Sequence, residues 1–104
     1  MTRIDDIPDM PSLRDHIDAL DEKLISLLAE RHALIDRAAR IKARDGLPAR
    51  IDHRVEQVVA NVRRHAAASN LDPALVETIW RQLIEAAIAQ EDRHLQDNAP
   101  PPRS

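Results

Sequence analysis

The sequence predicts an all-α protein with a three-helix chain and a long first helix, assembled as an intertwined helical homodimer. Its 104 residues fit a single domain, and the 43% that are hydrophobic are almost all aliphatic, with one Trp and no Phe or Tyr. Because the chain has one Gly and few strand-favouring residues, helices are the expected element. A long apolar stripe with alternating spacings of three and four residues supports the same fold class.

The first helix is expected to begin at Ser12, placed as an N-cap after Pro11, and to end before Gly46 and Pro48. At 1.5 Å per residue, its about 32 residues make a helix on the order of 50 Å long, far beyond the radius of gyration of about 13 Å of a compact domain. The stripe therefore needs a second long helix, and we expect it from an identical chain in a two-fold dimer. We call this stripe the seam; it consists of Leu13, Ile17, Leu20, Leu24, Leu27, Arg31, Leu34, Ala38 and Ile41.

Two shorter helices are expected after a turn at residues 45–51. Asp52 is placed to cap the second helix, and Asn70 is placed for a left-handed cap at its end. Asp72 as N-cap and Pro73 as first helical residue predict the start of the third helix. The expected division is a flexible N-terminal tail at 1–11, a helical domain at 12–95 and a disordered C-terminal tail at 96–104.

Composition argues against several function classes. The net charge of −3 and the near absence of aromatic residues are unlike nucleic-acid-binding proteins, which carry a basic excess and stacking aromatics. No apolar run reaches the roughly 18 residues of a membrane span, so no membrane partner is expected. The absence of cysteine favours a reducing, cytoplasmic setting. The five histidines never stand three or four residues apart, so no metal site is expected.

Charged residues on the apolar stripes are the main functional signal. Arg31 and Lys42 lie on the stripe of the first helix. Arg54 lies near the start of the second helix, and Glu91 continues the stripe of the third. One interpretation is that each cation extends to solvent or pairs with a nearby carboxylate. The other is a pocket for a small dicarboxylate, because guanidinium groups bind carboxylates through two parallel hydrogen bonds. Arg14 lies roughly 25 Å before Arg31 along the helix, so it can complete only a partner's cluster.

Three segments of the sequence resemble the all-helical class of chorismate mutases. They are LRDHIDALDEKLISLLAERHALIDRAARIKARDGLP, IDHRVE and LDPALVETIWRQLIEAAIAQE, and the likeness extends over about residues 13 to 95. The resemblance implies an intertwined homodimer with shared active sites. It also implies an isomerase that rearranges chorismate to prephenate in aromatic amino acid biosynthesis, with no cofactor and no metal. Such a [3,3] rearrangement needs positioning and hydrogen-bond donors rather than a nucleophile.

The resemblance also implies a role for each charged residue. Arg14 would reach across the dimer to one substrate carboxylate, and Arg31 would hold the other. Lys42 would donate to the ether oxygen whose bond breaks, and Arg54 would support the binding surface nearby. Glu91 stands where many members have a glutamine that donates to the same oxygen. Since only a protonated carboxyl donates, we expect activity to favour acidic pH, and we expect Glu91→Gln to flatten the pH profile.

Four further positions bear on the substrate. Gln90 lies about 100° around the helix from Glu91 and is the weaker candidate for the same donor role. Ile51, Val55 and Ala87 replace polar residues that help enteric-type members bind the ring hydroxyl and a carboxylate. The same cationic set also resembles isochorismate-pyruvate lyases and 4-amino-4-deoxychorismate mutases. A non-catalytic helical dimer, in which the cations of the stripes have no catalytic role, is the further alternative.

Overall fold

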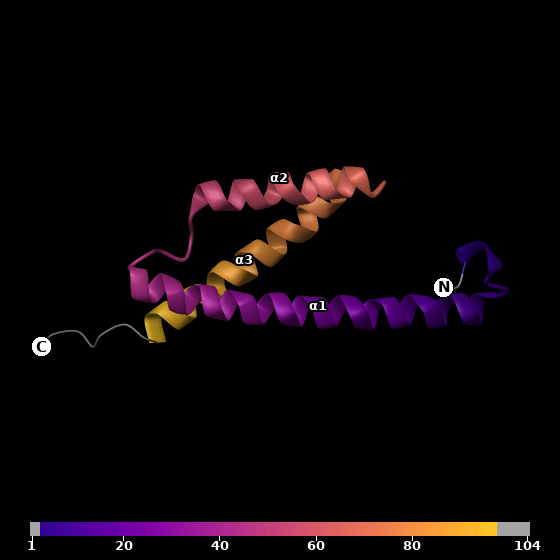
Figure 1. The fold of residues 1–104 in the computed structure, drawn as a ribbon, viewed down its shortest axis with the longest axis horizontal. Helices are drawn as coiled ribbons and strands as arrows, with labels where there is room; N and C mark the ends of the chain where they lie inside the picture. The colour runs from indigo at the N-terminus through magenta and orange to yellow at the C-terminus, as the bar shows by residue number, and fades with distance from the viewer. Residues whose placement is uncertain (1–2, 98–104) are drawn as a thin grey trace, which may run out of the picture. The chain divides into compact units, whose positions relative to one another are not determined.

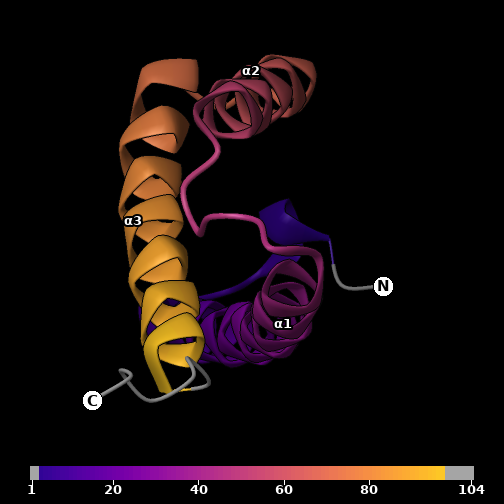
Figure 2. The ribbon, with the colours of Figure 1, turned by 90° about the vertical axis from the view of Figure 1, so that its left-hand side faces the viewer.

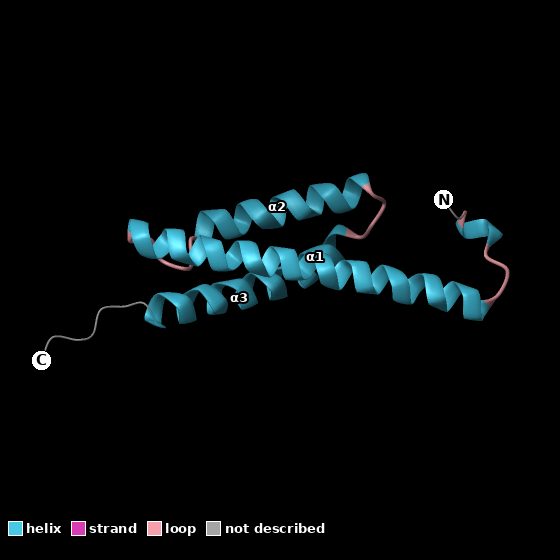
Figure 3. Cartoon of the chain, turned by 60° about the horizontal axis from the view of Figure 1, so that its bottom comes forward, coloured by secondary structure: helices cyan, strands magenta, loops and turns pink. Residues whose placement is uncertain are grey.

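A computed structural model describes residues 3–97 as helices joined by short connections (Figures 1 and 3). A short 3-10 helix, η1 (Ile4–Asp6), precedes three α-helices: α1 (Met10–Asp45), α2 (Asp52–Ala68) and α3 (Pro73–Asp97). No strand occurs within the described range, so the predicted all-α class is confirmed. None of these helices has an apolar stretch long enough to cross a membrane. The chain divides into two compact units, Met1–Ala33 and Leu34–Ser104.

Capping contacts determine where α1 and α3 begin. The Asp9 Oδ1 atom accepts a hydrogen bond from the backbone N–H of Ser12 at 2.9 Å, and α1 starts at Met10. The predicted N-cap at Ser12 is therefore wrong, because Asp9 satisfies the free N–H groups one turn earlier. Part of the tail expected at 1–11 is accordingly helical. Asp72 caps α3 as predicted, since its Oδ1 atom accepts from the N–H of residue 74 at 2.9 Å.

The ends of α1 and α2 follow glycine and asparagine signals in the sequence. Gly46 has a φ of 70° directly after the last residue of α1, and Asn70 has a φ of 59° after the end of α2, as predicted. Ile51, in an extended conformation, takes the N-cap position of α2. The prediction of Asp52 as cap is wrong by one residue; its carboxylate lies in the first turn instead, where the helix dipole favours it.

The core of the second unit lies where α2, α3 and the connection at residues 46–51 meet. Figure 2 shows this connection running beside α3, where Ala49 is buried. α3 ends at Asp97, so the first two residues of the tail predicted at 96–104 are helical. The other residues of that tail lie outside the described range. The core contains Ala49, Val59, Ile84 and Ile88, with Val55, Val58 and Leu95 packed against them.

The first unit exposes most of the part of the seam that it contains. Ile17, Leu20, Leu24 and Leu27 are between 49% and 59% exposed, and no residue from 3 to 33 is buried. A lone helix has no surface against which to bury an apolar stripe, and most helical stability in proteins comes from such burial. The described part of this unit therefore presents a continuous apolar face without a core of its own.

Candidate active site

Lys42 of α1 and Glu91 of α3 form an ion pair in the second unit. The Lys42 Nζ atom donates to Glu91 Oε2 and to the backbone oxygen of Ala49, the latter at 2.7 Å. Their side chains are only 18% and 6% exposed. An ammonium group has three hydrogens, so these two acceptors leave one hydrogen for a ligand. The two residues predicted to donate to the same substrate oxygen therefore meet in the folded chain.

The protonation state of Glu91, which is 5% exposed, determines what this pair can offer a ligand. When Glu91 is protonated, the pair can present an N–H and an O–H donor to one ligand oxygen. When Glu91 is ionised, only the Lys42 donor remains, and a negative charge lies beside it.

Gln90, the alternative donor, makes a different contact. Its Nε2 atom donates to Asp36 Oδ1 of α1 at 2.6 Å, and the residue is 8% exposed. Glu91, about 100° further around α3, is the residue that reaches Lys42. Asp36 was not among the predicted site residues. Asp36 is half-buried on α1, six residues before Lys42, and the pattern of charges on apolar stripes did not indicate it.

The start of α2 combines one guanidinium with aliphatic side chains. Arg54 is exposed, and its Nη1 atom donates to Gln57 Oε1 at 2.8 Å. Ile51 is half-buried at the N-cap, and Val55 packs against the core cluster. On α3, Ala87 is 8% exposed. The three apolar residues therefore contribute to packing in this chain, with no side-chain donor or acceptor.

The two arginines predicted to bind carboxylates lie in the first unit. Arg31 is half-buried and Arg14 is exposed, both on α1. They stand roughly 25 Å apart along the helix axis, so they cannot bind the same small molecule from one chain. The continuous helix α1 contains both residues, as predicted.

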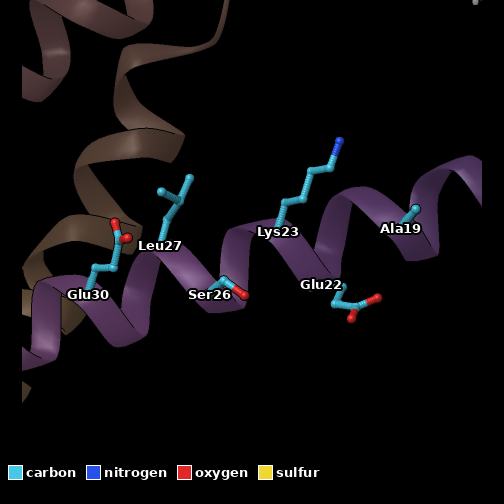
Figure 4. Close-up of a pocket in the computed structure, with 6 residues that line it drawn as sticks. All are labelled: Ala19, Glu22, Lys23, Ser26, Leu27 and Glu30. Atoms are coloured by element: carbon cyan, nitrogen blue, oxygen red, sulfur yellow. The ribbon is translucent and has the colours of Figure 1, made fainter.

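The surface of the first unit is hollowed beside the seam. This depression is formed by α1 alone, so it is open to solvent and does not enclose a ligand. Within residues 3–97, no three His, Cys, Asp or Glu side chains are grouped to hold a metal ion. The depression in Figure 4 is lined by residues that were not predicted for the site: Ala19, Glu22, Lys23, Ser26, Leu27 and Glu30.

The ion pair lies in the part of the chain that matches a known family of enzymes. The family model described as "Chorismate mutase type II" matches residues 13–92, which include both members of the pair. The chain belongs to this family. The matched range also includes Arg14, Arg31 and Arg54.

Curated relatives of the chain have several names. The T-protein of Enterobacter agglomerans is 31% identical over 86 residues, covering 83% of this chain and 23% of the relative. The chorismate mutase of Methanocaldococcus jannaschii is 29% identical over 91 residues, covering 88% and 92%. The 4-amino-4-deoxychorismate mutase of Streptomyces pristinaespiralis is 29% identical over 92 residues, covering 88% and 71%. The chain spans about a quarter of the T-protein and of a bifunctional chorismate mutase/prephenate dehydratase from Enterobacter agglomerans.

Proposed function

We propose that the chain is an isomerase that rearranges chorismate to prephenate in aromatic amino acid biosynthesis. The observation that supports this most directly is the buried pair of Lys42 and Glu91, in which an ammonium hydrogen is left for a ligand. The proposed reaction uses no metal and no organic cofactor. Since the sequence has no cysteine, we also propose a reducing compartment, the cytoplasm.

The proposed mechanism consists of positioning and charge stabilisation. In one concerted step, the C–O bond of the ether breaks as a C–C bond forms, so no atom is gained or lost. Lys42 and protonated Glu91 donate to the ether oxygen as negative charge grows on it. Arg31 of one chain binds one carboxylate, and Arg14 of the partner subunit binds the other. Together they hold the side chain of the substrate over its ring. Arg54 supports the surface nearby.

A homodimer is part of this proposal, because one chain does not supply all of these groups. The exposed seam supports it, since an identical seam from a second chain offers an apolar surface of matching length. The separation of Arg14 and Arg31 along α1 supports it too, because only two antiparallel chains bring such residues to one ligand. We therefore propose two active sites per dimer, each sharing residues from both chains.

A rearrangement of 4-amino-4-deoxychorismate is the second candidate function. Two Streptomyces relatives carry that name, and the matches cover 71% and 82% of their lengths. The apolar side chains of Ile51, Val55 and Ala87 provide no partner for a ring hydroxyl or for the ring amino group of this compound, so they favour neither substrate. The proposed mechanism is the same for both substrates.

The test is to incubate the purified protein separately with chorismate, isochorismate and 4-amino-4-deoxychorismate and to follow the products by chromatography. We expect prephenate from chorismate, and we expect Lys42→Gln to lower kcat/KM by about 100-fold because a donor to the ether oxygen is lost. Arg40→Ala, which removes an exposed cation from the same helix, is the matched control and should retain activity. A folded dimer that leaves chorismate unchanged would refute the proposal, and turnover of 4-amino-4-deoxychorismate alone would establish the second candidate.

A further inference from the structure

A second polar contact joins α1 to α3, made by the residue next to Glu91. Gln90 Nε2 donates to Asp36 Oδ1 at 2.6 Å, and His94 Nε2 lies 4.0 Å from the same oxygen. Gln90 is 8% exposed, so its amide has little access to water. α3 therefore contacts α1 through two consecutive side chains, Gln90 to Asp36 and Glu91 to Lys42.

These two contacts differ in stiffness. Lys42 carries its charge on a flexible four-carbon chain, which can follow a moving carboxylate. Asp36 has a short side chain, and Gln90 is confined by burial, so their contact tolerates less displacement. On α1 the two contact points are six residues, or about 9 Å, apart along the axis. Together with the core packing of α3, two such points fix the rotation of α3 against α1 more narrowly than the Lys42 contact does alone.

We propose that Asp36, acting through Gln90, is a positioning residue for the pair of Lys42 and Glu91. Asp36 holds the amide of Gln90, and the backbone of α3 transmits that orientation to Glu91, the next residue. Without Asp36, the buried amide loses this acceptor, and α3 is held less firmly in the orientation that directs Glu91 towards Lys42. The catalytic consequence rests on the proposed function.

The experiment measures kcat and KM for chorismate in Asp36→Ala, Asp36→Asn and Gln90→Met. Because a small misplacement of a catalytic group is costly, Asp36→Ala and Gln90→Met should each lower kcat by about tenfold. KM should change less, since the arginines proposed to bind the carboxylates are untouched. Asp36→Asn should restore activity because the asparagine Oδ1 still accepts from Gln90. The double variant Asp36→Ala/Gln90→Met should be no worse than either single variant, because both remove the same contact.

Asp92→Ala is the matched control, because it removes an equal charge from an exposed residue beside Glu91. The proposal is overturned if Asp36→Ala keeps the kcat of the wild type, or if Asp36→Asn is as impaired as Asp36→Ala. It is also overturned if Asp92→Ala loses as much activity as Asp36→Ala. Where Asp36→Ala does not fold, Gln90→Met, which keeps the side-chain volume, gives the same test.

A readout independent of activity separates this inference from the proposed function. The 13C chemical shift of the Glu91 carboxyl carbon reports its surroundings in the absence of substrate. Asp36→Ala and Gln90→Met should change that shift, whereas Asp36→Asn should leave it near the wild-type value. A wild type without mutase activity in which this pattern holds would refute the proposed function and retain the positioning role. An unchanged shift in Asp36→Ala would refute the positioning role.

Discussion

Replacement of Glu91 by glutamine tests the proposed chemistry at its most sensitive point. In the wild type, only a protonated carboxyl donates to the ether oxygen, so kcat should fall as the pH rises from about 5 to about 9. The decrease should level off at a factor of about 100 to 1,000, which is the cost of losing one such donor. A glutamine amide donates at every pH, so the variant should vary by less than about threefold over the same range.

The assay is kcat against pH, from pH 5 to 9, with both proteins checked for helix content at each pH. In Glu91→Gln the new amide oxygen would still accept from Lys42, so the fold should be retained. Glu85→Gln is the control, since the exposed Glu85 is hydrogen-bonded to Arg50 Nη2 at 2.5 Å. It removes a carboxyl from the same helix and should keep the wild-type profile. A Glu91→Gln enzyme with the pH slope of the wild type would refute the donor role of Glu91.

Three further predictions concern assembly, core and surface. Leu24→Glu, at the centre of the exposed seam, should dissociate the proposed dimer and abolish activity, while Ala29→Glu on the polar face of α1 should do neither; light scattering distinguishes them. Ile88→Ala removes a core side chain that is 9% exposed and should lower the free energy of unfolding by about 3 kcal/mol, measured by urea denaturation. Hydrogen bonds from Arg81, and then from Arg63, hold the pKa of Glu77 below its ordinary value of 4.5. The resulting stabilisation is present above pH 4.5 and lost as the pH falls through the lower folded-state pKa, so the gap in melting temperature between wild type and Glu77→Gln should close in acid.

Features that depend on neighbouring residues were predictable from the sequence. Asp72 with its proline, and Asn70, act within one turn of the backbone, and both predictions are confirmed. The start of α1 was less certain for a physical reason. Asp9 and Ser12 lie within one turn and are both good caps, and the sequence pattern does not determine which of them the helix uses.

Some contacts of the candidate site were predictable from the apolar pattern, and others were not. Lys42 and Glu91 both lie on apolar stripes, so facing stripes bring them together, and their meeting was predictable. The contact of Gln90 with Asp36 joins residues 54 positions apart and depends on the rotation of α3, which a hydrophobic pattern defines only broadly. The Ala49 oxygen on Lys42 depends on the path of a connection, which no side-chain pattern encodes.

Because Lys42 donates to the main-chain oxygen of residue 49, this hydrogen bond depends on the length of the connection at residues 46–51 rather than on the side chain at position 49. Every amino acid carries a carbonyl, so a small replacement such as Ala49→Gly leaves the acceptor where it is. Deleting one residue between Gly46 and Ile51 shifts the carbonyl by about 3.5 Å, beyond hydrogen-bond reach. Natural or engineered variation in this connection should therefore accept exchanges at its exposed positions and small side chains at position 49, and it should reject insertions and deletions.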